Sequence, residues 1–214
     1  MSDNFDQTYW DERYGAGNDV WSGAPNPVLV SETLALPAGS ALDIGCGEGA
    51  DAIWLASRGW TVTAADFSAV ALERAAARSR NAGVDPAESA AIANRILWEH
   101  HDFTAWAPPE GTFDLVSAQF MHLPSVQRTT LFRRLASAVA AGGTLLIVGH
   151  DVSDSHHQGH TPPADMFFTA AEVAASLDSA LWHVDVAESR PRATKDPGGT
   201  VITLTDAVVS ARRR

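Results

Sequence analysis

A short glycine-rich stretch constrains the fold of this 214-residue chain more than any other feature. It reads Leu-Asp-Ile-Gly-Cys-Gly-Glu-Gly over residues 42–49, between an apolar run at 40–44 and a helical pattern from Ala50. Glycine has no Cβ, so such a loop turns sharply and lets a ligand approach the backbone. In open α/β sheets, ligands bind at the carboxyl ends of the parallel strands. The stretch therefore predicts a strand, a ligand-binding loop and a helix.

The rest of the chain alternates apolar strand-like runs with helical segments. Further strands are expected at 61–65, 95–101, 113–118, 144–148, 182–189 and 201–209. Helices are expected at 5–14, 27–36, 50–58, 68–82, 125–140 and 170–177. This order predicts a single α/β domain with a Rossmann-like, doubly wound, seven-stranded sheet that is mostly parallel. The last two strands are joined without a helix, so an antiparallel last strand is expected.

Acidic residues flank the glycine loop. Asp43 and Glu48 place negative charge beside it, which would repel a pyrophosphate and suits a cationic sulfonium and ammonium ligand. Asp66 ends the second strand, at the distance expected for a ribose-binding acid. Asp102 ends the third strand, at the rim where an adenine amino group can be held. The loop spacing G-x-G-x-G differs from the dinucleotide pattern G-x-G-x-x-G, which argues against an NAD-dependent oxidoreductase.

Four motifs in the same order resemble those of the class I S-adenosylmethionine (SAM)-dependent methyltransferases. Residues 43–49 resemble motif I, and Asp66 matches the ribose-binding acid of that family. Residues 101–103 match its adenine-flanking motif, 113–116 its fourth strand and 142–145 the start of its fifth. The resemblance implies SAM as the cofactor. The cofactor-binding residues that it implies are Asp43, Gly45, Cys46, Gly47, Gly49, Asp66, Phe67, Asp102, Phe103 and Gln119.

The N-terminal segment resembles the lid of the tellurite-resistance and thiopurine methyltransferase-like branch, which methylates small, often soft nucleophiles. The resemblance lies in residues 9–14, 21–23 and 25–27. We expect residues 1–39 to form a helical lid and residues 40–214 the SAM-binding core. Trp10, Tyr14 and Trp21 are its aromatic residues, and cation–π attraction favours tryptophan over a sulfonium. The alternative for Trp10 is a place in a small hydrophobic core.

Two histidines are candidates for catalysis. His122 follows the fourth strand and His150 the fifth, so both are expected at the ligand crevice. Either one is a candidate general base for a hydroxyl acceptor, whereas a soft thiol needs little base. His122 is alternatively a packing residue. His150 also opens a cluster with Asp151, His156, His157 and His160, for which a flexible loop gives no fixed ligand geometry, so no bound metal is expected.

The charge and the apolar pattern of the chain argue against several classes of protein. A net charge of −11 and a pI near 5.0 repel nucleic acid and anionic membrane surfaces. The sequence has no long apolar run and no signal-peptide pattern, so a cytoplasmic protein is expected. Cys46 is expected to pack rather than to act as a nucleophile. Arg212–Arg214 is expected to be a frayed, solvated end.

The function expected from the sequence is methyl transfer to a small-molecule acceptor by in-line displacement. The acceptor classes considered are a thiol, a chalcogen oxyanion and a hydroxyl. A non-catalytic SAM-binding module is the alternative, followed by an NAD-dependent oxidoreductase. The identity of the acceptor and the oligomeric state stay open at this point.

Overall fold

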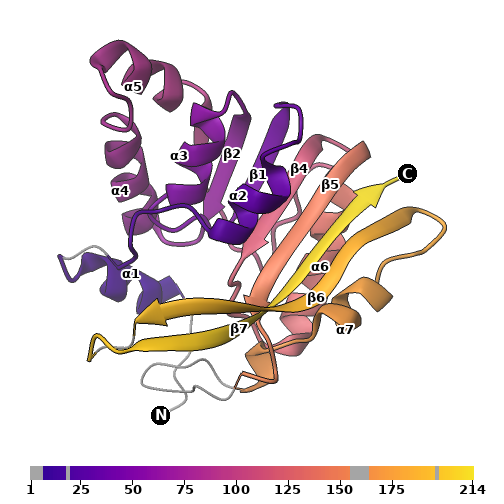
Figure 1. Ribbon diagram of the computed structural model, residues 1–214. Coiled ribbons are helices and arrows are strands. Elements are labelled where there is room, and N and C mark those ends of the chain that lie inside the picture. The colour runs from indigo at the N-terminus through magenta and orange to yellow at the C-terminus, as the bar shows by residue number, and fades with distance from the viewer. Residues whose placement is uncertain (1–6, 18–19, 155–163, 196–197) are drawn as a thin grey trace.

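A seven-stranded sheet with helices on both faces forms the molecule (Figure 1). The computed structural model describes residues 7–17, 20–154, 164–195 and 198–214. The strands are β1 (Ser40–Ile44), β2 (Thr61–Asp66), β3 (Ile96–His100), β4 (Phe113–Gln119), β5 (Val139–His150), β6 (Trp182–Lys195) and β7 (Val201–Arg213). Their order across the sheet is β3-β2-β1-β4-β5-β7-β6. The strand order reverses beside β1, so the glycine loop that follows β1 lies at the switch point of the sheet.

Strand pairing agrees with the expected topology. β1 pairs in parallel with β2 and β4, while β3 and β5 extend the parallel sheet on either side. β7 is antiparallel to both β5 and β6. The predicted single-domain, mostly parallel α/β sheet with an antiparallel last strand is confirmed.

Several of the helices begin after a side-chain cap. They are α1 (Gln7–Gly15), α2 (Pro27–Thr33), α3 (Ala50–Ser57), α4 (Ala69–Ser79), α5 (Pro86–Ala93), α6 (Ser125–Ala138) and α7 (Ala170–Ala175). Ser68 caps α4 by accepting from the amide of Ala71, and Thr169 and Glu172 form a reciprocal capping box at α7. α5 was not predicted, although Asp85 caps it and Pro86 occupies its first turn. Among the described residues, no helix has both the length and the apolar character needed to cross a bilayer.

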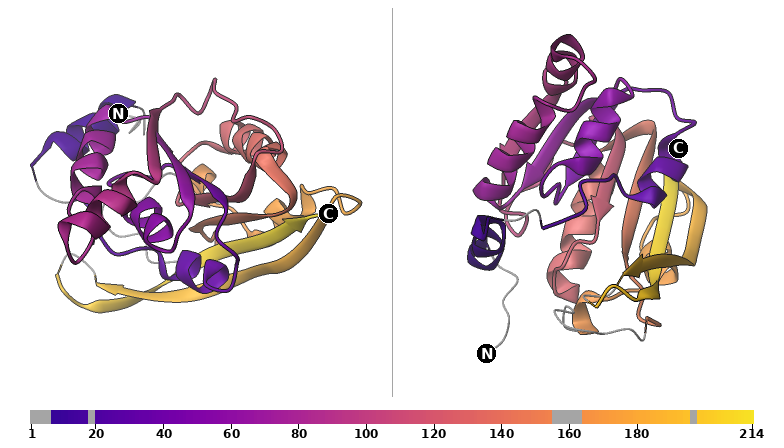
Figure 2. Two further views of the ribbon diagram at one scale, coloured as in Figure 1. Left: turned by 90° about the horizontal axis from the view of Figure 1, so that it is seen from above. Right: turned by 60° about the vertical axis from the view of Figure 1, so that its left-hand side comes forward.

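Helices lie on both sides of the sheet (Figure 2), and the buried side chains form two hydrophobic clusters. Leu29 and Leu55, from α2 and α3, pack on one face. Leu131 and Leu135 of α6 pack on the other. All four side chains are fully buried, and each such burial contributes roughly 1.5–3 kcal/mol. This rigid double layer holds the carboxyl ends of β1, β2, β4 and β5 in fixed positions.

The C-terminal arginines belong to the sheet. β7 continues to Arg213, whose guanidinium donates to the carbonyls of Ser137 and Val139. Arg212 forms two hydrogen bonds of 3.0 Å with Asp185. The prediction of a frayed C-terminus is therefore wrong, because these side chains find partners on α6, β5 and β6.

Candidate active site

The glycine loop connects β1 to α3 at the carboxyl edge of the sheet. Gly47 and Gly49 have positive φ angles of 52° and 80°. A Cβ on Gly47 would lie 2.8 Å from the hydroxyl oxygen of Tyr14, and a Cβ on Gly49 would lie 2.6 Å from the ring of Trp98. Gly47 therefore faces the N-terminal segment, whereas Gly49 faces the packed interior.

Asp66 ends β2 directly beside the loop. Its two carboxylate oxygens accept from the amides of Gly47, at 2.8 Å, and of Ser68, at 2.9 Å. Burial raises the pKa of Asp66. Because a carboxylate has about four acceptor sites, both oxygens keep capacity for hydroxyl donors. The position suits the ribose contact that the resemblance implies, and the contact itself stays a prediction.

Two more buried carboxyl groups lie next to the loop. Asp51, in the first turn of α3, accepts from the amide of Asn26 at 2.6 Å, and burial raises its pKa to about 6. Burial, reinforced by the charges of Asp51 and Asp66, also raises the pKa of Asp43 well above its usual value. Removal from water disfavours the ionised form of an acid. The loop is therefore an acid-rich environment, and a positively charged group placed there would favour the ionised forms of these acids.

Asp51→Asn is expected to stabilise the ligand-free protein at about pH 7.5 and to change little near pH 4. The folded-state pKa of about 6 lies above the ordinary value of 3.8, so the folded protein binds more protons than the unfolded chain between these values. The contribution of Asp51 to the free energy of unfolding is therefore fully present below pH 3.8 and is lost as the pH rises through about 6. Thermal unfolding measured at a series of pH values should give Asp51→Asn a midpoint at least about 3 °C above that of wild type at about pH 7.5.

A matched control for this experiment is Glu73→Gln, which removes an exposed acid of α4. Its effect on the unfolding midpoint should vary little with pH. A difference between wild type and Asp51→Asn that is the same at every pH would contradict the prediction.

Glu48 has a different role from the one expected. It is buried, and one carboxylate oxygen pairs with the Arg74 guanidinium of α4 at 3.0 Å. The other oxygen accepts from the amides of Val20 and Trp21, both at 3.2 Å. The interpretation of Glu48 as a charge for a cationic ligand is therefore corrected, because Arg74 neutralises it. Glu48 instead anchors the N-terminal segment to the glycine loop.

The predicted lid aromatics lie against this loop. Trp10 and Tyr14 are 8% and 4% exposed and form a small cluster with Ala71 of α4. The Tyr14 hydroxyl accepts from the indole N–H of Trp21 at 3.0 Å, and burial raises the pKa of Tyr14, so the phenol stays protonated. Trp21 is 46% exposed. Trp10 thus has core-like packing, Trp21 stays accessible, and the function of the segment as a lid stays a prediction.

The two predicted catalytic histidines lie together. The ring centroids of His122 and His150 are 5.6 Å apart, and His122 also stacks on Trp10 at 5.9 Å. Burial, together with the nearby His150 and Arg13, lowers the pKa of His122 to about 3. His122 is therefore neutral near pH 7 and is a weak base. This position of His122 is compatible with either of the two roles expected for it, a role in catalysis or a role in packing.

Phe120 and Arg13 are site neighbours that were not predicted. Phe120 has a φ of 53°, a conformation that is costly for a bulky residue and that clusters at functional sites. Its ring lies 4.9 Å from that of His150. The guanidinium carbon of Arg13 lies 5.6 Å from the ring of Trp10 and 5.3 Å from that of Trp21. Both residues gain their place through tertiary contacts, for which the sequence carries no local signal.

The residues after β2 and β3 form an aromatic wall. Phe103 is buried, 5.9 Å from the ring of Phe67 and 6.4 Å from that of Trp106. Asp102 is exposed and accepts from the hydroxyl and the amide of Thr104, which lowers the pKa of Asp102. Contacts of Asp102 and Phe103 with an adenine stay predictions. Cys46 is half-buried, and burial raises the pKa of its thiol, as suits the predicted packing role.

Two buried acceptor atoms of the described residues have no hydrogen-bond partner at this edge. They are Oδ2 of Asp43, on β1, and Oε1 of Gln119, at the end of β4. The amide nitrogen of Gln119 donates to the Ser117 hydroxyl at 2.9 Å. A buried acceptor without a donor costs roughly 1–3 kcal/mol, so these atoms favour a ligand that donates hydrogen bonds. The ammonium and hydroxyl groups of SAM meet that requirement.

The histidine-rich loop is described only at its start. His156, His157 and His160 lie outside the described residues, so the expectation of no bound metal stays a prediction. Within the described residues, no group of three or more side chains is arranged to hold a metal ion.

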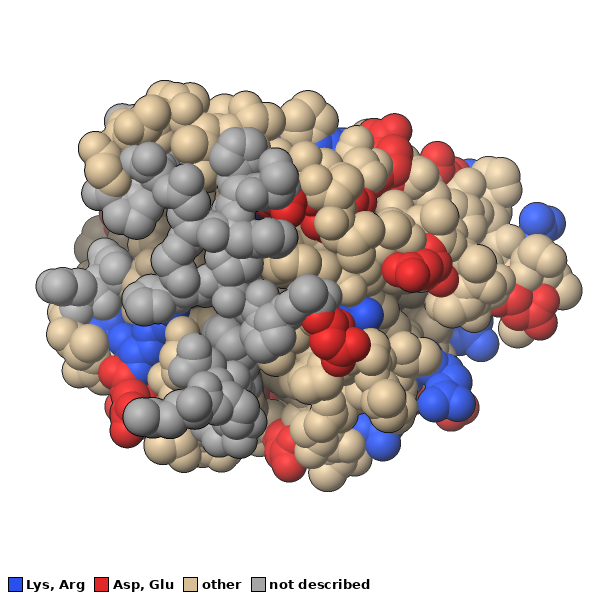
Figure 3. Space-filling model, turned by 90° about the horizontal axis from the view of Figure 1, so that it is seen from below, with Lys and Arg blue, Asp and Glu red and all other residues tan. Residues whose placement is uncertain are grey.

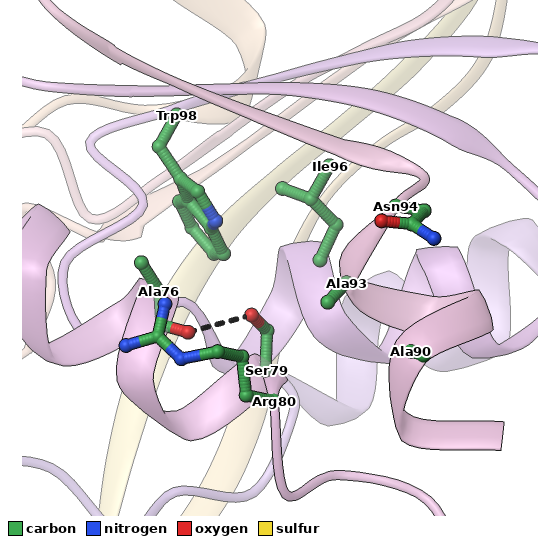
Figure 4. Close-up of a pocket in the computed structure, with 8 residues that line it drawn as sticks. All are labelled: Ala76, Ser79, Arg80, Ala90, Ala93, Asn94, Ile96 and Trp98. Atoms are coloured by element: carbon green, nitrogen blue, oxygen red, sulfur yellow. Dashed lines mark hydrogen bonds between the residues drawn. The ribbon is translucent and has the colours of Figure 1, made fainter. Parts of the chain in front are cut away.

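A separate hollow of about 380 Å³ lies between α4, α5 and β3 (Figure 4). Most of its lining is apolar, including Ala90, Ala93, Ile96 and Trp98. The Ser79 hydroxyl at its wall donates to the carbonyl of Ala76 at 2.9 Å. The hollow has no acid or histidine in its lining, so the carboxyl edge of the sheet is the better candidate for an active site.

Residues 41–143 match the family model described as a methyltransferase domain. The matched part covers slightly less than half of the chain and is similar to a methyltransferase domain. SAM is the cofactor that this similarity supports. The glycine loop, the acid that ends β2 and the switch-point position belong to the region that the family model covers.

Curated relatives of the methyltransferase domain act on different acceptors. Human glycine N-methyltransferase is 27% identical over 152 residues, which cover 67% of this chain and 52% of the relative. Trans-aconitate 2-methyltransferase of Rhizobium meliloti is 33% identical, and the match covers 56% of this chain and 41% of the relative. Probable thiol methyltransferase 2 of Arabidopsis thaliana is 34% identical, covering 50% and 45%. The chain thus spans about half the length of these relatives.

Solved structures share the fold over nearly the whole chain. A structure concerned with conversion of a disulfide bond into a thioacetal group during echinomycin biosynthesis has a TM-score of 0.72 at 20% identity, covering 100% of this chain and 91% of that one. TehB from Haemophilus influenzae has a TM-score of 0.69 at 17% identity, and the match covers 97% of this chain and 67% of TehB. The shared fold therefore extends beyond residues 41–143 of this chain.

Proposed function

We propose that this chain is an enzyme that transfers a methyl group from SAM to a small-molecule acceptor by in-line displacement. The supporting observation is that the glycine loop is bordered by the aromatic N-terminal segment, at the edge where two histidines meet. SAM supplies a methyl group on a positively charged sulfur that is a good leaving group. The chain itself binds the reactants, orients them and excludes water.

Several residues are suited to hold the cofactor. Asp66 would accept from the ribose hydroxyls, and the unpaired oxygens of Asp43 and Gln119 would accept from donors of the ligand. Tyr14 and Trp21 would cover the ligand above Gly47. The aromatic cover supports catalysis over a purely binding role, because it shields the reacting groups from water.

The histidine pair narrows the acceptor chemistry. A hydroxyl acceptor requires a general base with a pKa near the working pH. His122, with a pKa of about 3, is too weak, which leaves His150 as the candidate. A thiolate or a chalcogen oxyanion arrives already deprotonated and requires neither histidine as a base. In that case His122 and His150 would position the acceptor.

The net charge of the chain and the names of its relatives support a small molecule as the methyl acceptor. The relatives' names specify glycine, trans-aconitate and a thiol, which are small molecules or groups. The net charge is −11, and on the face shown in Figure 3 acidic and basic side chains are interspersed. A surface of this kind offers no support for nucleic acid as a substrate.

The proposed function predicts release of S-adenosylhomocysteine (SAH) in a screen of thiols, oxyanions, phenols and amines. His150→Gln should lower turnover of a phenol by about 100-fold and change turnover of a thiol little. His183→Gln, at an exposed position on β6, is the matched control. SAM binding without SAH release from any acceptor class would favour a non-catalytic binding module instead.

A further inference from the structure

We propose that Arg13 binds an anionic group of the methyl acceptor, so that the acceptor carries a carboxylate or another oxyanion. This inference rests on the proposed function and specifies its substrate class. Arg13 lies on α1, and its half-buried side chain contacts the rings of both Trp10 and Trp21.

The Arg13 guanidinium has aromatic neighbours and no acidic partner among the described residues. One of its nitrogens donates to the Tyr9 hydroxyl at 3.0 Å, whereas a guanidinium has five N–H donors. Of the two acids of α1, Asp11 accepts from the Ser68 hydroxyl at 2.6 Å and Glu12 is exposed. The remaining donors of Arg13 are thus suited to a ligand.

Other arginines of this acidic protein do have carboxylate partners. Arg74, Arg190, Arg192 and Arg212 each lie within 3.0 Å of an Asp or Glu oxygen. Arg13 differs from them because it contacts two tryptophan rings beside the candidate active site and has no such partner among the described residues. A charge held against aromatic rings without a counter-ion creates a positive potential, which is strengthened where water is partly excluded.

The surroundings of Arg13 contain an indole ring and two imidazole rings. The ring of Trp10 stacks on His122, and His122 neighbours His150. A planar guanidinium matches the geometry of a carboxylate, which accepts two parallel hydrogen bonds from it. An acceptor with an acidic group and an apolar body would therefore place its anionic group on the N–H donors of Arg13 and its body against the aromatic residues, with its nucleophile directed toward the glycine loop.

Calorimetry on the SAH-saturated full chain tests this with isosteric probes. Benzoate is compared with benzamide, and 3-mercaptopropionate with its amide. Wild type should bind each acid about tenfold more tightly than its amide, or more. Arg13→Gln should abolish this preference, Arg13→Lys should retain part of it, and Arg133→Gln on the exposed face of α6 should leave it intact.

The SAH affinity of the same variants distinguishes the two anions that Arg13 could bind, namely the acidic group of the acceptor and the carboxylate of the cofactor. The proposal expects Arg13→Gln to bind SAH as wild type does. Loss of SAH affinity with an intact acid preference would overturn it, because the guanidinium would then bind the carboxylate of the cofactor. Equal binding of acid and amide by wild type would overturn it as well. Failure of wild type to bind SAH would instead refute the proposed function.

Discussion

Gly47→Val is expected to abolish SAM binding while the sheet remains folded. The valine Cβ would lie 2.8 Å from the Tyr14 hydroxyl and 3.5 Å from the Trp21 indole nitrogen, in space next to the loop where we place the ligand. The φ of 52° adds roughly 1–2 kcal/mol of backbone strain for a residue with a Cβ. Calorimetry should detect no SAM binding, and the far-ultraviolet circular dichroism should stay that of wild type.

Two other glycines separate the contributions of strain, packing and ligand contact. Gly142→Ala introduces a Cβ at a φ of 79° with nothing within 4 Å, so it should lower stability slightly and leave SAM binding intact. Gly49→Val would place a Cβ 2.8 Å from that of Ala75 and closer still to Trp98, so it should destabilise the fold itself. A Gly47→Val protein that binds SAM normally would contradict the close approach of ligand to this backbone.

The sheet was predictable because its signals are local. Apolar strands, glycine breaks and caps such as Ser68 and Thr169 each act within a few residues, and they fix the order of elements. The same holds for the placement of Asp66 at the end of β2, which follows from strand length alone. The positions of His122 and His150 at one edge follow from the parallel arrangement of β4 and β5.

The errors have physical causes of two kinds. The start of α5 carries a local signal, since Asp85 caps it and Pro86 occupies its first turn, but the short, alanine-rich helix lacks an amphipathic pattern. In contrast, Glu48 and Arg74 lie 26 residues apart, and only the packing of α4 beside the loop brings them together. The pairing of Arg212 with Asp185 depends in the same way on the register of β6 against β7.

Removing residues 1–23 is expected to leave a folded domain with little activity. β1 begins at Ser40, so the sheet stays complete, whereas the loss of Tyr14 and Trp21 uncovers Gly47. Glu48 would keep Arg74 as a partner and lose the amides of Val20 and Trp21. Turnover should fall far more than the unfolding midpoint, because a lid excludes water from the reaction without supporting the sheet.

Trp21→Ala provides the finer test of the lid. Trp21 is 46% exposed, so its truncation should change the unfolding midpoint little, and loss of cation–π cover should lower turnover by about tenfold. Leu181→Ala is the control, at a residue that is 51% exposed. SAM should also slow amide exchange in peptides from residues 9–17 and 20–26. Slow exchange there without ligand, or a truncated chain that does not fold, would show that Trp10, Tyr14 and Ala71 make this segment part of the core.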